Sequence, residues 1–167
     1  VRVFCNHGAR AGSSLLHAHW QVVALGFEPP AAAARCAAQR RHATCPVDEV
    51  LESAPVVYED DLCVAVAVVA ARAGTVWVVP KKRVRRLRDC DDALCRALGR
   101  GLRFVAAAAA AAWDDVDYNA VWRGATSPGR FHCYCEFAPH RREDASLGQL
   151  QYDVPISHLS PEAAAAA

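Results

Sequence analysis

Short stretches of apolar and β-branched residues recur along the chain, separated by turn-forming residues, and they predict a series of β-strands. The first stretch covers residues 1–5 and alternates in character, and the second covers residues 18–25. Clusters of Glu, Asp, Arg, Ala and Gly separate the later ones. The remaining predicted strands are 55–58, 62–69, 74–79, 116–123 and 130–138.

One long helix interrupts this run of strands. Between residues 91 and 113, Leu94, Leu98, Leu102 and Val105 repeat at intervals of four, four and three, which places them on one helix face. Residues 31–41 have helical composition without an apolar stripe and predict a connecting helix. A last helix is expected from Ser160, with Ser160 as N-cap and Pro161 at the first helical position. Strands, one long helix and further strands predict an α+β fold with a mainly antiparallel sheet.

The amino-acid composition and net charge limit which classes of function are plausible for this chain. The chain has 167 residues, 53% of them hydrophobic, and a net charge of +1, which is typical of a globular protein and gives no support for nucleic-acid binding. No run of about 20 apolar residues suggests a membrane span. The eight cysteines are scattered, so we expect free thiols in a reducing, cytoplasmic setting. The chain begins at Val1 and has no methionine, so we expect it to be the C-terminal part of a longer protein.

The segment 6–21 carries the candidate chemistry. His17, His19 and Gln21 alternate, so they should share one face of the second strand, with Trp20 pointing into the core. Alone, this pattern is more typical of two core histidines and a surface glutamine. A turn rich in glycine and serine precedes it directly, and such turns expose N–H groups and hydroxyls that bind phosphate oxygens. The combination favours a phosphate site, because a neutral imidazole is a competent nucleophile and a glutamine amide can stabilise a phosphoryl oxygen.

Seven positions of this segment match a family motif at fixed spacing. The pattern Asn-x-Gly-x-x-x-Gly-x-Ser-x-x-His-x-His-x-Gln is met by Asn6, Gly8, Gly12, Ser14, His17, His19 and Gln21. The chain therefore resembles the galactose-1-phosphate uridylyltransferase family of the histidine-triad superfamily. Hydrolase branches of that superfamily usually have a third histidine where Gln21 stands, so the resemblance favours a transferase. Phe131, His132 and Tyr134 resemble the plant-type ADP-glucose phosphorylase branch.

The resemblance implies roles for these residues. His19 would be the nucleophile that forms a covalent nucleotidyl-histidine, and Gln21 would stabilise the transferring phosphoryl group. The nucleotide phosphates would be bound by Asn6, Gly12, Ser13 and Ser14. Gln149 stands near the place where the family contacts the sugar. The implied partners are a nucleoside diphosphate hexose and a hexose 1-phosphate, and the resemblance also allows a homodimer.

Zinc is the cofactor that the resemblance implies. His17 would be one ligand of a first site, whose other ligands would lie upstream of Val1. The phosphorylase branch has a second zinc, and its four ligand positions correspond here to Cys45, Asp48, Arg83 and His132. Cys45 and His132 suit zinc and Asp48 is acceptable, but Arg83 cannot bind a metal. Packing without metal is the favoured interpretation, and His42 is the only substitute ligand nearby.

The resemblance also predicts the domain layout: residues 1–28 as the end of a first histidine-triad-like lobe, 29–43 as a linker, and 44–167 as a second lobe. The predicted activity is nucleotidyl transfer between a nucleoside diphosphate hexose and a hexose 1-phosphate. Three alternatives stay open: adenylyl transfer to phosphate as in ADP-glucose phosphorylase, a truncated or degenerate paralogue without turnover, and a dinucleotide hydrolase, which Gln21 disfavours. The basic segment 81–88 and residues 140–144 are expected to be solvated loops.

Overall fold

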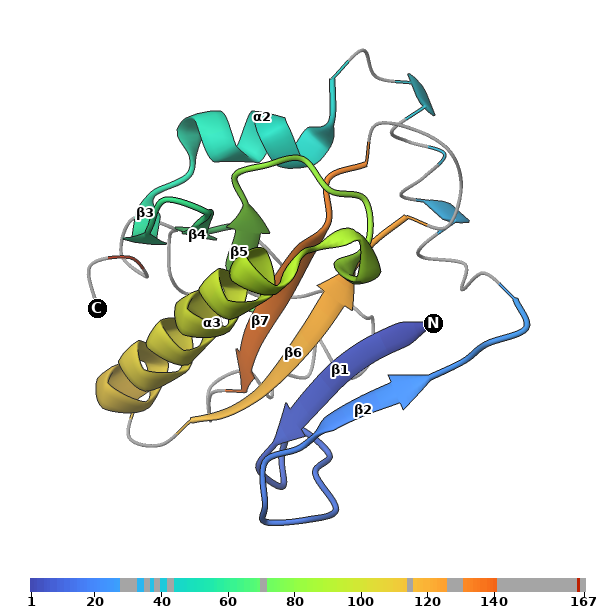
Figure 1. Cartoon of the computed structure of the whole chain (residues 1–167). Coiled ribbons are helices and arrows are strands. Elements are labelled where there is room, and N and C mark those ends of the chain that lie inside the picture. Colours follow the sequence, from blue (N-terminus) through green and yellow to red (C-terminus); the bar gives the residue numbers. More distant parts are fainter. Residues whose placement is uncertain are drawn as a thin grey trace.

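The computed structural model describes residues 1–27, 33–34, 37, 40–41, 44–69, 72–113, 116–125, 131–140 and 165. The elements that it describes over their whole length are seven strands, two α-helices and one 3-10 turn (Figure 1). Residues 33–34, 37, 40–41 and 165 are also helical. The strands are β1 (Arg2–His7), β2 (Trp20–Val23), β3 (Val56–Glu59), β4 (Cys63–Ala67), β5 (Val76–Pro80), β6 (Asp117–Arg123) and β7 (Tyr134–His140). The helices are α2 (Pro46–Ser53) and α3 (Asp92–Trp113), and the 3-10 turn is η1 (Leu87–Asp89).

The seven strands form one sheet in the order β2-β1-β6-β7-β5-β4-β3, and every neighbouring pair is antiparallel. This confirms the predicted α+β class with an antiparallel sheet. Strand β1 lies between β2 and β6, so the sheet continues without a break from the residues of the predicted first lobe to those of the second. The division into two lobes stays a prediction.

Helix α3 covers one face of the sheet (Figure 1). Its predicted stripe is confirmed, since Leu94, Leu98 and Val105 are buried against the strands. Asp91 caps its start, where the Leu94 N–H donates to Asp91 Oδ1 at 2.8 Å. The helix lies close to the sheet at Gly101, where an added Cβ would be only 3.1 Å from Val78 Cγ1.

Helix α2 was not predicted from the sequence, although Pro46 at its start and acidic Asp48 in its first turn are typical of a helix N-terminus. Its Val47 packs in a second core cluster with Val79. Because Val78 belongs to the α3 cluster and Val79 to the α2 cluster, β5 is covered on both faces. This burial explains why β5 is continuously apolar instead of alternating.

Several predicted boundaries differ from the structure. Strand β2 begins at Trp20, and β7 runs from Tyr134 to His140 instead of 130–138. The prediction that Trp20 is a core residue is wrong: 47% of it is exposed, because β2 is an edge strand that no described helix covers. Most of the predicted 31–41 helix, and the start of the helix at Ser160, lie outside the described residues.

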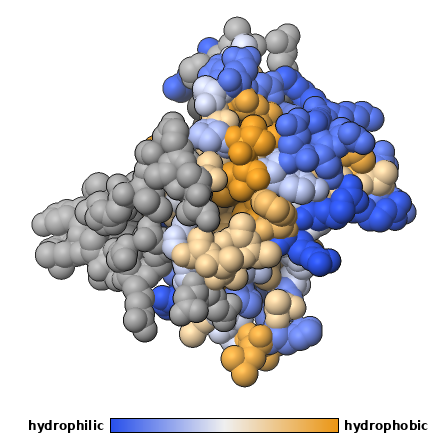
Figure 2. Space-filling model, turned by 90° about the vertical axis from the view of Figure 1, so that its left-hand side faces the viewer, coloured by the Kyte–Doolittle hydropathy of each residue, from blue (hydrophilic) through white to orange (hydrophobic). Residues whose placement is uncertain are grey.

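The surface is chemically mixed. On the side shown in Figure 2, a strip of hydrophobic residues lies beside a hydrophilic area. The seven described cysteines are all free, and five of them are buried in the two core clusters. In the described part of the chain, no helix is long and apolar enough to cross a membrane.

Candidate nucleotidyl-transfer site

The turn between β1 and β2 has a defined backbone conformation. Gly8 and Gly12 have φ angles of 84° and 79°, which favour glycine because other residues meet steric resistance there. The Gly12 N–H donates to the Ala9 carbonyl at 3.0 Å, and the Ser13 N–H donates to the Gly8 carbonyl at 3.1 Å. The glycine positions of the motif therefore build a tight turn, as expected for a phosphate-binding segment.

Asp117, at the start of β6, holds this turn in place through hydrogen bonds to Arg10. Its Oδ2 accepts the Arg10 backbone N–H at 2.7 Å and the Arg10 Nε–H at 3.2 Å. Burial alone would raise the pKa of Asp117, but the two hydrogen bonds from Arg10 lower it below its ordinary value. Gly8 makes room for this carboxylate, since a Cβ on Gly8 would lie 2.1 Å from Asp117 Cγ.

Asn119 fixes a second part of the turn. Its Nδ2 donates to Asn6 Oδ1 at 2.8 Å and to the Ala11 carbonyl at 3.0 Å. Its Oδ1 accepts hydrogen bonds from Arg72 at 3.1 Å and from His140 Nε2 at 2.5 Å. The expectation that His140 lies in a solvated loop is therefore wrong, because this residue ends β7 and takes part in a polar network.

These supporting residues were not singled out as site residues from the sequence. They come together because β1 pairs with β6 so that Asn6 faces Asn119 and His7 faces Tyr118. The His7 and Tyr118 rings stack with centroids 4.8 Å apart. Only this pairing register brings consecutive residues of β6 under the turn, and no local pattern in the sequence reveals it.

His17 and His19 do not sit on a regular strand, which corrects the prediction that they share a strand face with Gln21. Both precede β2, and only Gln21 lies within it. His19 Nδ1 is 2.8 Å from the His17 carbonyl oxygen. Since a carbonyl only accepts, Nδ1 must carry the hydrogen, and the lone pair of the neutral ring is then on Nε2.

A cavity of about 250 Å³ lies beside His19, between the β1–β2 end of the sheet and α3. Its lining includes His19, Trp20, Tyr118 and Arg103. Cys5 also lines it, and burial raises the pKa of its thiol above the ordinary value, although a hydrogen bond with the His19 backbone opposes this. The raised pKa keeps the Cys5 thiol from ionising readily, so His19 is the candidate nucleophile among the residues that line this cavity.

The other predicted phosphate-binding residues lie in the same turn. Asn6 and Ser13 are partly buried, whereas Ser14 and His17 are exposed. The Ser13 hydroxyl donates to the Leu15 carbonyl at 2.6 Å. Gln149 lies outside the described residues.

The basic segment after β5 is largely paired with carboxylates. Lys81 contacts Glu59 at 2.7 Å and Arg86 contacts Asp89 at 2.9 Å. Arg83 pairs with Asp48, which His132 also contacts. Because these cations are paired, the segment does not form an open anion-binding patch.

Within the described ranges, no group of three or more His, Cys, Asp or Glu side chains could hold a metal ion.

Comparisons with known proteins add a sequence relative and several solved structures with a similar fold. No protein-family profile matches the chain. An ADP-glucose phosphorylase of Arabidopsis thaliana is 30% identical over 124 residues, which are 71% of this chain and 35% of the relative. The chain thus spans about a third of the curated relative that it matches.

Solved structures show the same fold. An Arabidopsis thaliana ADP-glucose phosphorylase with bound ADP-glucose has a TM-score of 0.88 and 23% identity, covering 99% of this chain and 57% of its own. A uridylyltransferase has the same TM-score and identity, with 99% and 58% covered. A HIT family protein from Bacillus anthracis has a TM-score of 0.52 and 18% identity, with 60% and 76% covered. The sequence relative therefore confirms the predicted resemblance to the plant ADP-glucose phosphorylase branch, and the solved structures show that this chain shares its fold with a uridylyltransferase and, over part of its length, with a HIT family protein.

Proposed function

We propose that this chain carries the nucleophile of a nucleotidyltransferase and that His19 is that nucleophile. The observation that supports this most directly is the 2.8 Å contact between His19 Nδ1 and the His17 carbonyl, which leaves the lone pair on Nε2. The same contact stabilises the positive charge that the ring acquires when Nε2 attacks phosphorus.

The reaction has two displacements. In the first, His19 Nε2 attacks the α-phosphorus of a nucleoside diphosphate hexose, the N–P bond forms, and the P–O bond to the leaving phosphate breaks. The electron pair of that bond leaves with hexose 1-phosphate. In the second, an oxygen of an acceptor phosphate attacks the same phosphorus, and the N–P bond breaks to regenerate the neutral ring.

The β1–β2 turn would bind the phosphates. In this structure the Gly12 and Ser13 N–H groups and the Ser13 hydroxyl bond within the turn and hold its shape. Phosphate binding would then fall first to Ser14 and to the side-chain amide of Asn6, whose Oδ1 is held by Asn119. The Gln21 amide would donate to a phosphoryl oxygen in the transition state. Arg10 adds a positive charge to the turn, although Asp117 neutralises part of it.

Two donor and acceptor pairs are candidates. Transfer between UDP-hexose and hexose 1-phosphate is implied by the motif. Adenylyl transfer from ADP-glucose to inorganic phosphate is favoured by the relative at 30% identity, which is an ADP-glucose phosphorylase. A paralogue without turnover and a dinucleotide hydrolase are the remaining alternatives.

Covalent trapping tests the proposal. The full-length protein is mixed with ADP-glucose or UDP-glucose labelled at the α-phosphate, and an acid-labile, base-stable label is expected on His19. The His19→Gln variant should carry no label, whereas His158→Gln, outside the motif, should carry as much as wild type. A folded wild-type protein without label would refute the enzyme proposal. Discharge of the label by phosphate, by hexose 1-phosphate or only by water distinguishes phosphorylase, transferase and hydrolase.

Some expectations remain proposals that this experiment does not address. A zinc ion at His17 would need ligands from elsewhere, because the described residues supply only this exposed histidine at that position. No step of the mechanism above passes through that ion. Sugar contact by Gln149, a homodimer and a cytoplasmic location likewise stay predictions.

A further inference from the structure

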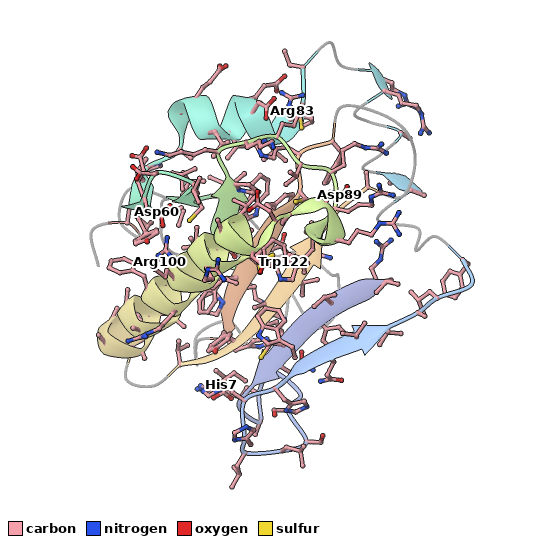
Figure 3. The ribbon with its side chains drawn as sticks, in the orientation of Figure 1. His7, Asp60, Arg83, Asp89, Arg100 and Trp122 are labelled. Carbon is pink, nitrogen blue, oxygen red and sulfur yellow. The ribbon has the colours of Figure 1, made fainter. Side chains whose placement is uncertain are left out.

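Three of the four positions that correspond to the second zinc of the phosphorylase branch contact one another in the structure. Asp48 lies in the first turn of α2, Arg83 follows β5, and His132 precedes β7. His132 Nδ1 is 2.9 Å from Asp48 Oδ1, and the Arg83 guanidinium pairs with Asp48 Oδ2. Figure 3 places Arg83 beside α2, at the end of the molecule opposite to His7 and the β1–β2 turn.

His132 has no ring nitrogen left for a metal. Its Nε2 is 2.7 Å from the Pro80 carbonyl oxygen, and this contact requires a hydrogen on Nε2. Its Nδ1 shares a hydrogen with Asp48, so both nitrogens are used whichever group supplies that hydrogen. The ring is only 3% exposed, which prevents it from turning toward another ligand without repacking.

Arg83 supplies a positive charge where a metal ion would supply two. Its guanidinium contacts the Asp48 carboxylate, and that contact also neutralises the acidic charge that would attract a cation. The like charge of Arg83 opposes entry of Zn²⁺ at the same place. Arg83 therefore fills the position of the fourth ligand and repels a metal ion from it.

Cys45 is the remaining sulfur ligand, and it has a structural role. It is 1% exposed and packs with Val47 and Phe131 in the second core cluster. Its carbonyl accepts the Asp48 and Glu49 N–H groups at 2.9 and 3.2 Å, which begins α2. One thiol cannot by itself hold a structural zinc, which uses four N or S ligands.

We propose that Arg83, Asp48 and His132 form a metal-free bridge that replaces zinc in this chain, tying α2 to the segments that follow β5 and precede β7. The bridge joins the same three segments that a four-ligand metal site at these positions would join. This part of the fold is therefore independent of zinc supply and of chelators. The proposal rests on the resemblance and not on the proposed activity of His19.

Metal analysis of the full-length protein tests the bridge. Wild type and Cys45→Ser should contain equal amounts of zinc, and EDTA should leave the melting temperature of both unchanged in a His17→Ala background, which removes any metal bound at His17. Because Cys45 and position 48 have the C-x-x-C spacing of zinc sites, the double variant D48C/R83H should gain one zinc per chain. Its melting temperature should then fall on chelation.

Two results would overturn the proposal. One is a zinc equivalent in wild type that Cys45→Ser loses, since the site would then hold metal despite Arg83. The other is a folded D48C/R83H variant that takes up no zinc, since the two replaced residues would then not be what excludes it. Arg83→Met gives a third measurement. This variant should have a lower melting temperature and an unchanged zinc content. Zinc uptake by Arg83→Met would overturn the proposal, because Cys45, Asp48 and His132 would then suffice to hold the metal.

Discussion

Replacing Gly8 with alanine tests whether the Asp117 carboxylate fixes the candidate phosphate-binding turn. Any alanine at a φ of +84° costs about 1–2 kcal/mol, offset by about 0.4–1 kcal/mol from the stiffer unfolded chain. At Gly8 the new Cβ would also lie 2.1 Å from Asp117 Cγ, so the carboxylate must move. Losing its hydrogen bond from the Arg10 N–H then costs about 1.5–3 kcal/mol. We expect a total loss of about 3 kcal/mol.

Gly12 provides a matched control within the same turn. Its φ is 79°, but an added Cβ would meet only Asn6 Nδ2, at 4.0 Å. Gly12→Ala should therefore cost only the backbone part, about 1 kcal/mol. The difference of about 2 kcal/mol between the two variants isolates the Asp117 contact. Urea unfolding followed by tryptophan fluorescence measures both.

A double-mutant cycle identifies the cause. In an Asp117→Ala background the carboxylate is absent, so the difference between Gly8→Ala and Gly12→Ala should shrink to below about 0.5 kcal/mol. Equal destabilisation by the two glycine variants in the wild-type background would refute the reasoning, because the close approach at Gly8 would then carry no energetic weight. A difference that persists without Asp117 would refute it as well.

Three further predictions concern the polar network, the pH dependence and the thiols. Asn119→Ala removes the donor to Asn6 and Ala11 and should slow labelling of His19 by about tenfold, the effect of about 1.4 kcal/mol, while the urea midpoint changes little; an unchanged labelling rate would contradict it. The pKa of Asp60 is lowered, since the N–H groups after it and Arg100 outweigh the effect of burial. The ionised Asp60 carboxylate stabilises the fold above the unfolded pKa of about 4, and this stabilisation is lost as pH falls through the lower folded pKa. Asp60→Asn should therefore flatten the dependence of the unfolding free energy on pH below about 4. An unchanged slope would contradict this prediction. Cys95 is exposed, whereas burial raises the pKa of Cys63 to about 12, so a thiol reagent should modify Cys95 before Cys63, as peptide mapping would show.

Local patterns in the sequence predicted much of the fold. The apolar stripe of α3 and the β-branched stretches are patterns of neighbouring residues, and their periods of 3.6 and 2 set secondary structure directly. They predicted the long helix of residues 91–113 and the antiparallel α+β class. The motif from Asn6 to Gln21 likewise identified the candidate nucleophile, because it is defined by residue types at fixed spacing along the chain.

The tertiary structure decided what each of these residues contacts. Trp20 was expected in the core, but its strand became a sheet edge, and sheet order is not a local property. Helix α2 escaped prediction because eight residues carry little periodic signal. Its Asp48 meets Arg83 and His132 across 35 and 84 residues of sequence.

The same distinction applies to the candidate site. The sequence determined which side chains could perform the chemistry, since the identity of an imidazole or an amide is fixed by the residue. Only the pairing of β1 with β6 placed Asp117 and Asn119 under the turn. Only the fold around His19 assigned its hydrogen to Nδ1. The register of β1 against β6 joins residues more than a hundred positions apart, as in the bonds from Arg10 to Asp117 and from Asn119 to Asn6, and long-range packing, not local preference, sets it.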